Sequence, residues 1–187
     1  MNSRYDRPME KVVFLDRDGV ISKDSPDHIK SWDEFFFLPN AKAGIKLLTD
    51  HDFKIIVITN QSVIARGMTT VEELEDMHKK MIHEIEIYGG KISDIYYCPH
   101  HPNDGCTCRK PEPGMLLKAI KDHDIDPTRS FMVGDRMMDV NVGKKVGCRT
   151  VIIPSDVGLK ELQKSDSKPD YIANDLLDAG GWIIENY

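Results

Sequence analysis

Residues 11–20, KVVFLDRDGV, join a β-branched and aromatic run to two aspartates, Asp16 and Asp18, and a glycine. A short apolar run bounded by turn-forming residues is typical of a buried strand. Comparable runs occur at 53–59 (FKIIVIT), 94–98 (DIYYC), 130–135 (SFMVGD), 149–154 (RTVIIP) and 170–173 (DYIA). The sequence therefore predicts six strands, the first of which ends in carboxylates.

Helical spacing of apolar residues fills most intervals between these strands. The predicted helices cover 41–51, 71–88, 114–123, 138–146 and 175–185. Strands that alternate with helices favour an α/β fold with a doubly wound, mostly parallel sheet. No repeat or linker interrupts the chain, so we expect one domain over residues 1–187, in which 1–10 form a loosely held tail.

Composition limits the class of protein and its partners. Of 187 residues, 40% are apolar and 30% are charged, and the net charge is −6. This acidic balance argues against a nucleic-acid partner, because proteins that neutralise many phosphates gather Lys and Arg into a basic face. No apolar run approaches the roughly 20 residues of a membrane helix, and the first residues lack a signal-peptide core. We therefore expect a soluble, cytoplasmic protein without a membrane partner.

Polar residues come directly after the apolar runs of four predicted strands. They are Asp16, Asp18, Thr59, Asn60, Cys98, His100 and Asp135. Ligands of open α/β sheets bind beyond the carboxyl ends of the strands, so residues needed for chemistry should lie there. The pattern predicts a functional site at this edge of the sheet.

The segment Asp16-Arg17-Asp18-Gly19 places two carboxylates two residues apart at a strand end. An ionised aspartate can attack phosphorus when a cation neutralises the crowded charge. A second acid nearby can protonate the leaving oxygen and then deprotonate water. The alternative is an Asx-turn that closes the strand.

A third carboxylate, Asp135, follows another strand, and Asp139 lies one helical turn later. Mg²⁺ requires near-octahedral oxygen ligands and typically takes one or two carboxylates with phosphate and water. Asp16, Asp135 and a backbone carbonyl near Asp18 meet that requirement. The alternative is that Asp135 caps a helix with Asp139 in its first turn, and both interpretations can hold together.

Two further segments offer groups that can hold phosphate oxygens. The first consists of Thr59, Asn60, Gln61 and Ser62, which supply hydroxyls and backbone N–H groups after a strand. In the second, Lys110 follows Arg109 and can supply a fixed positive charge to a transferring phosphoryl group. The alternatives are ordinary polar turn residues and a surface Lys-Pro loop.

Three of the four cysteines lie within residues 98–108. Together with a histidine they form the set Cys98, His100, Cys106 and Cys108. Three thiolates and one imidazole are a closed tetrahedral Zn²⁺ set, which leaves no open position for catalysis, so the predicted zinc is structural. The alternatives are free thiols and a disulfide, and a reducing compartment disfavours the disulfide.

Four blocks together, FLDRDGVI, ITNQSVIARG, CPHHPNDGCTCRKPEPGML and MVGDRMMDV, resemble the haloacid dehalogenase (HAD) superfamily. Within it they are similar to the heptose bisphosphate phosphatase and histidinol phosphatase group. The resemblance implies a Rossmann-like core without a separate cap domain, and a magnesium-dependent phosphatase that uses an aspartyl-phosphate. It implies that Asp16 is the nucleophile, Asp18 the acid/base and a carbonyl ligand of magnesium, and Asp135 the distal ligand. Thr59 and Lys110 would stabilise the phosphoryl group.

The resemblance also implies a substrate pocket. Its expected residues are Asp24, Ser25, Asp27, Asn60, Gln61, Ser62, Arg109 and Arg136. Two segments are more similar to the heptose branch than to the histidinol branch: the stretch SPDHIKSWDEFFFLP and the ending IARG. In the heptose branch, D-glycero-D-manno-heptose 1,7-bisphosphate loses its C7 phosphate during lipopolysaccharide synthesis. We therefore expect a monomer that acts on a small phosphorylated sugar. The alternatives are a histidinol phosphatase, a polynucleotide 3′-phosphatase and a non-catalytic phosphoacceptor module.

Overall fold

A computed structural model describes residues 10–187, so the predicted tail lies, apart from Glu10, outside the described residues. The described chain forms one six-stranded sheet in which every neighbouring pair is parallel and the order is β3-β2-β1-β4-β5-β6. The strands are β1 (Lys11–Leu15), β2 (Phe53–Asn60), β3 (Asp94–Cys98), β4 (Ser130–Gly134), β5 (Arg149–Ile152) and β6 (Tyr171–Ile172). The prediction of a doubly wound α/β sheet is confirmed, and the sheet is wholly parallel.

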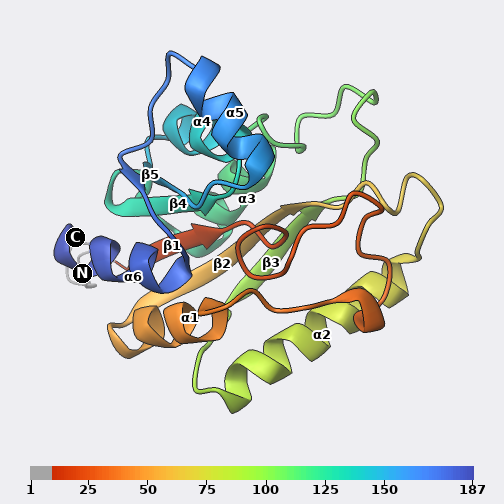
Figure 1. The fold of residues 1–187 in the computed structure, drawn as a ribbon, viewed down its shortest axis with the longest axis horizontal. Coiled ribbons are helices and arrows are strands. Elements are labelled where there is room, and N and C mark those ends of the chain that lie inside the picture. The colour runs from red at the N-terminus through yellow and green to blue at the C-terminus, as the bar shows by residue number, and fades with distance from the viewer. Residues whose placement is uncertain (1–9) are drawn as a thin grey trace, which may run out of the picture.

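Helices cover both faces of the sheet (Figure 1). One face carries α1 (Ala41–Asp50), α2 (Val71–Ile87) and α6 (Leu176–Glu185), and the other carries α3 (Gly114–His123), α4 (Met137–Val146) and α5 (Asp156–Lys164). Single 3₁₀ turns lie at Trp32–Glu34 and Pro127–Arg129. None of the helices in residues 10–187 has the length and apolarity needed to cross a membrane.

Alternation along β1 supplies both hydrophobic layers. Val13 and Leu15 pack into the core under α1, α2 and α6, whereas Val12 and Phe14 pack into the core under α3 and α4. All four side chains are fully buried. Full burial of such a side chain stabilises the fold by about 1.5–3 kcal/mol. The apolar run that predicted a central strand is therefore explained by a strand buried on both faces.

Helix α5 was not expected from the sequence. Ser155 caps it, because the Ser155 hydroxyl accepts a hydrogen bond from the Gly158 N–H at 3.2 Å. Its first turn lies directly against the backbone of Asp135: a Cβ at Gly158 would come within 2.0 Å of the Asp135 carbonyl oxygen. The helix thus supports the end of β4.

The strand order places a switch point between β1 and β4. The chain runs outward from β1 through β2 to β3 on one side, and from β4 through β5 to β6 on the other. Crevices at such points, beyond the carboxyl ends of the strands, are where ligands of doubly wound sheets bind. Asp16 follows β1 and Asp135 follows β4, so both carboxylates lie at this point.

Candidate active site

A buried ion-pair cluster joins three segments that are far apart in the sequence. The Lys110 ammonium lies 3.0 Å from Asp16 Oδ2 and 2.7 Å from Asp139 Oδ1. All three residues are buried. Burial lowers the pKa of Lys110, but the charges of Asp139 and Asp16 outweigh burial and raise that pKa to about 12. The lysine is therefore charged and fixed against the predicted nucleophile.

The carboxylates of Asp16, Asp135 and Asp139 have oxygens within 4.8 Å of one another. Burial and the neighbouring carboxylates raise the pKa of Asp16 well above its usual value, against the opposing charge of Lys110, and raise that of Asp135 to about 7. Asp135 Oδ2 is buried and has no hydrogen-bond partner among the described residues. One lysine does not neutralise three carboxylates, so the cluster fits a further hard cation such as Mg²⁺. Because Lys110 already pairs with Asp139, Asp16 and Asp135 are the carboxylates that remain as ligands for such a cation.

Gly19 allows the loop after β1 to pass close to this cluster. Its φ is +89°, and a Cβ there would come within 2.6 Å of Asp135 Oδ2. A side chain would thus be strained by the backbone and would also clash with Asp135. The glycine after the two aspartates is required by the site itself.

Asp18 is held by four hydrogen bonds. Its Oδ1 accepts from Arg17 Nε at 2.8 Å and from the Ser22 hydroxyl at 2.8 Å, and its Oδ2 accepts from Arg17 Nη2 at 2.9 Å and from Gln61 Nε2 at 2.9 Å. Burial raises the pKa of Asp18, but the charge of Arg17 and these hydrogen bonds outweigh burial and lower that pKa below its usual value. The carboxylate is therefore ionised and oriented.

The carboxyl end of β2 and the residue after it direct two side chains, Asn60 and Gln61, at residues of the site. Asn60 brackets the backbone of Lys110: its Oδ1 accepts from Lys110 N at 3.0 Å and its Nδ2 donates to Lys110 O at 3.2 Å. Gln61 Nε2 donates to the Thr59 hydroxyl at 2.8 Å as well as to Asp18. The Ser62 hydroxyl accepts from Arg66 Nε at 3.4 Å. Asn60 and Gln61 thus hold Lys110 and Asp18, and their contact with substrate stays a prediction.

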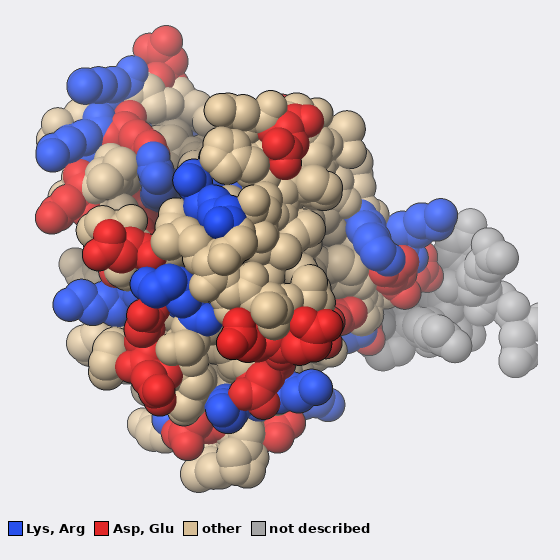
Figure 2. Space-filling model, turned by 90° about the vertical axis from the view of Figure 1, so that its right-hand side faces the viewer, with Lys and Arg blue, Asp and Glu red and all other residues tan. Residues whose placement is uncertain are grey.

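Three predicted pocket residues lie on the loop after β1. Asp24 and Asp27 are exposed and Ser25 is half-buried. Asp24 lines a cleft of about 590 Å³ together with Gly19 and Ser155. Figure 2 faces the carboxyl ends of the strands, where Lys and Arg are mixed with Asp and Glu and form no continuous basic band. This face does not have the charge pattern of a nucleic-acid interface.

The two predicted arginines have different surroundings. Arg109 is half-buried, and its Nη1 donates to the His100 carbonyl at 3.5 Å. Arg136 occupies the N-cap position of α4 without a capping hydrogen bond from its side chain, and it pairs with Glu161 of α5, which also accepts from Met137 N at 3.1 Å. The cap of α4 is thus Arg136, so the alternative in which Asp135 itself caps the helix is wrong.

The cysteine-rich loop brings four metal-binding side chains together. Cys98 Sγ lies 3.1 Å from Cys108 Sγ and 3.6 Å from Cys106 Sγ, and His100 Nδ1 lies 3.2 Å from Cys108 Sγ. The three cysteines are free thiols. A tetrahedral zinc with Zn–S bonds of about 2.3 Å sets its sulfurs roughly 3.8 Å apart. The four donors therefore converge as a Zn²⁺ ion requires, and none of the distances between their sulfurs is as short as the roughly 2.05 Å of a disulfide bond.

Residues 107–179 match the HAD-hydrolase-like family. A D-glycero-beta-D-manno-heptose-1,7-bisphosphate 7-phosphatase from Pseudomonas aeruginosa is 38% identical over 174 residues, which cover 93% of this chain and 98% of that protein. A 7-phosphatase from Chlorobaculum tepidum is 33% identical over 93% of this chain and 94% of its own. The chain belongs to the HAD superfamily of phosphatases. It is therefore a phosphoric monoester hydrolase.

A solved structure agrees with this assignment. It is the D,D-heptose 1,7-bisphosphate phosphatase from B. bronchiseptica, complexed with magnesium and phosphate. It matches this HAD phosphatase with a TM-score of 0.89 and 34% sequence identity, and the match covers 95% of this chain and 99% of that chain. The predicted resemblance to the heptose bisphosphate phosphatases and the predicted Rossmann-like HAD core are confirmed.

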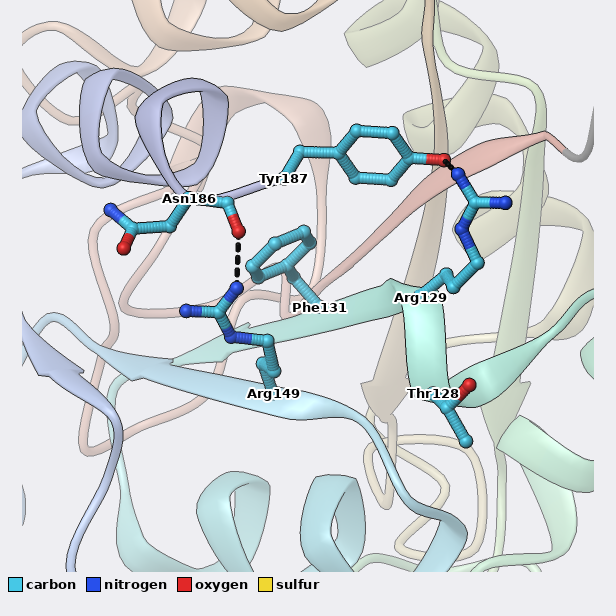
Figure 3. Close-up of a pocket in the computed structure, with 6 residues that line it drawn as sticks. All are labelled: Thr128, Arg129, Phe131, Arg149, Asn186 and Tyr187. Atoms are coloured by element: carbon cyan, nitrogen blue, oxygen red, sulfur yellow. Dashed lines mark hydrogen bonds between the residues drawn. The ribbon is translucent and has the colours of Figure 1, made fainter.

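A separate pocket in this HAD phosphatase lies away from the chemistry. It measures about 110 Å³ and is lined by Thr128, Arg129, Phe131, Arg149, Asn186 and Tyr187 (Figure 3). Thr128 and Arg129 precede β4, and Arg149 begins β5, so the pocket lies at the amino ends of the strands. Asp16 and Asp135 lie at the opposite ends of the strands, so this pocket is separate from the candidate active site.

Proposed function

We propose that this HAD phosphatase removes the C7 phosphate of D-glycero-D-manno-heptose 1,7-bisphosphate. The observation that carries the chemistry is the buried pair of Asp16 and Lys110, with 3.0 Å between carboxylate and ammonium, at the switch point of the sheet. The relatives named for this substrate match nearly the whole chain, which supports the choice of substrate. The expectations of a monomer and of a cytoplasmic location rest on the sequence and stay predictions.

The reaction has two steps. In the first, an Asp16 carboxylate oxygen attacks phosphorus, the bond between phosphorus and the sugar oxygen breaks, and protonated Asp18 gives its proton to that oxygen. In the second, Asp18 takes a proton from water, the water oxygen attacks the aspartyl-phosphate, and Asp16 and inorganic phosphate are released. The ionised, hydrogen-bonded Asp18 of the structure matches its state in the second step. Arrival of the dianionic substrate favours its protonation for the first.

Lys110 and Thr59 act on the phosphoryl group. Lys110 holds a positive charge next to the attacking oxygen of Asp16, where negative charge gathers as the phosphoryl group transfers. Thr59 is buried and lies beside Gln61, so its hydroxyl is held in place. Asn60 fixes the backbone of Lys110 from the neighbouring strand end.

Two metal ions complete the proposal. Asp16, Asp135 and the Asp18 backbone carbonyl would hold Mg²⁺, which supplies charge neutralisation to the phosphoryl oxygens when bound. Cys98, His100, Cys106 and Cys108 would hold a structural Zn²⁺. Because Lys110 lies two residues after Cys108, the zinc loop fixes the segment that delivers the catalytic lysine.

We expect phosphate release from heptose 1,7-bisphosphate to require Mg²⁺ and to exceed release from histidinol phosphate at matched concentration by at least about 100-fold in kcat/KM, a discrimination of about 2.7 kcal/mol. The measurement is inorganic phosphate released with and without Mg²⁺. Preference for histidinol phosphate would keep the mechanism and overturn the substrate. Release from neither substrate would contradict the proposed function, and a 3′-phosphorylated oligonucleotide tests the remaining enzymatic alternative.

Replacement of Cys106 by serine should lower bound zinc from about one ion per chain to well below one, because the site loses one of its four ligands. The melting temperature should fall, and KM should rise as the loop before Lys110 loosens. Metal analysis and a thermal melt measure these effects. Cys148→Ser is the matched control, since Cys148 is buried outside the zinc loop and should keep full zinc content. Unchanged zinc in the Cys106 variant would rule out the site.

A further inference from the structure

Arg17, between the two aspartates, is fully buried, with 0% of its surface exposed. Its Nε and Nη2 donate in parallel to the two oxygens of Asp18. The second Nη2 hydrogen is directed at Gln61 Oε1, at 3.1 Å. Nη1 faces His78 Nε2 at 3.1 Å and Met77 Sδ at 3.6 Å, both on α2. The five N–H groups of a guanidinium therefore all have an acceptor.

This geometry fixes the protonation of His78. A guanidinium has no acceptor, so His78 Nε2 must accept, and the proton of the neutral ring is on Nδ1. Burial and the charge of Arg17 lower the pKa of His78 to about 3, which agrees with a neutral ring. His78 is 5% exposed, and it is the only nitrogen acceptor that Arg17 Nη1 contacts within residues 10–187.

The orientation of Asp18 depends on that acceptor. If Nη1 lost it, a charged N–H group would be left buried with only a weak sulfur acceptor, which is costly. The guanidinium would gain by turning toward another acceptor, and turning would break the paired bonds to Asp18. Gln61 would not compensate, because it bonds both Arg17 and Asp18 and would shift with them.

We propose that His78 is a positioning residue for the phosphatase reaction: by accepting from Arg17 it holds the guanidinium group that fixes the orientation of the Asp18 carboxyl group. The inference rests on the proposed function, in which Asp18 protonates that oxygen. His78 touches no reacting atom and acts through Arg17. A histidine that only fills the core would instead affect stability and every substrate alike.

Leaving-group dependence separates these roles. A sugar phosphate releases a poor leaving group that needs a proton, whereas p-nitrophenyl phosphate releases a phenolate that leaves without one. His78→Leu should lower kcat/KM, which reports only the steps up to formation of the aspartyl-phosphate, by about 10–100-fold on the sugar phosphate, part of the contribution of general acid catalysis. It should change kcat/KM on p-nitrophenyl phosphate by no more than about 3-fold, because that step needs no proton from Asp18. His78→Gln, which returns an acceptor near Nε2, should restore most of the lost rate.

The controls keep the test decisive. Met81→Leu alters another buried residue of α2 and should leave the ratio of the two rates unchanged. His78→Met replaces the leucine variant if that variant does not fold. An equal loss on both esters, or no rescue by glutamine, would overturn the positioning role. A wild-type protein that is inactive on both esters would overturn the proposed function and this inference with it.

Discussion

Asp16→Asn should reduce kcat on the heptose bisphosphate by at least about 10⁴-fold, because the variant has no carboxylate to attack phosphorus. Removal of the nucleophile lowers kcat by at least this factor in enzymes that use one. The fold should persist. Burial and neighbouring carboxylates raise the pKa of Asp16, so its ionised form is unfavourable in the folded, metal-free protein, and the neutral amide relieves that repulsion. Steady-state phosphate release and a thermal melt without metal measure both effects.

The melting temperature of the metal-free Asp16 variant should therefore equal or exceed that of the wild type, and zinc content should be unchanged. Asp33→Asn is the matched control, since Asp33 is an exposed aspartate in the 3₁₀ turn at Trp32–Glu34. It should keep the wild-type rate. Magnesium-dependent turnover within about 100-fold of wild type in the Asp16 variant would falsify the covalent mechanism, because such activity requires another nucleophile.

The sequence predicted the elements whose signals are local. All six strands are confirmed. The central strands β1, β2, β4 and β5 are buried along most of their length and appear as apolar runs, whereas the edge strands β3 and β6 are only partly buried. The five predicted helices are confirmed to within a residue at each end. Helix α5 was missed because Val157 and Leu159 are exposed and contribute no apolar face, and because Gly158 weakens its helical pattern. Its position depends on contact with Asp135, which a local pattern does not contain.

The same distinction applies to the site. Residues at strand ends could be found from the sequence, since topology alone brings them to one edge. In the sequence Asp139 is only a further carboxylate one helical turn after Asp135, and its pairing with Lys110 across 29 residues is visible only in the structure. Arg17 and His78 carried no signal, because a buried arginine and a helical histidine gain meaning only from the atoms around them.

Lys110→Met should have the second largest effect, on both activity and stability. We expect a loss of about 10²–10³-fold in kcat, the size seen when one fixed electrostatic group is removed from a transition state. The fold should also lose about 3–5 kcal/mol, since the variant leaves Asp16 and Asp139 buried without their cation. For a chain of this length that loss corresponds to a fall in melting temperature of roughly 6–20 °C.

The pH dependence of stability separates a lost charge from a lost side-chain volume. In the wild type the raised pKa of Lys110 means that its pair with the carboxylates stabilises the fold fully below the ordinary lysine value of 10.5 and is lost as pH rises through about 12. In the methionine variant the cost includes that of ionised Asp16, whose pKa burial already raises, so the cost should shrink as pH falls and Asp16 takes up a proton. Lys145→Met is the matched control. Lys145 lies on α4, and its exposed ammonium donates to the carbonyl of Pro111, the residue after Lys110, at 2.9 Å. Its removal should change the free energy of unfolding by less than about 0.5 kcal/mol. A stability loss in the Lys110 variant that is constant from pH 8 to pH 4 would mean that packing, rather than charge, explains why a lysine is buried beside the nucleophile.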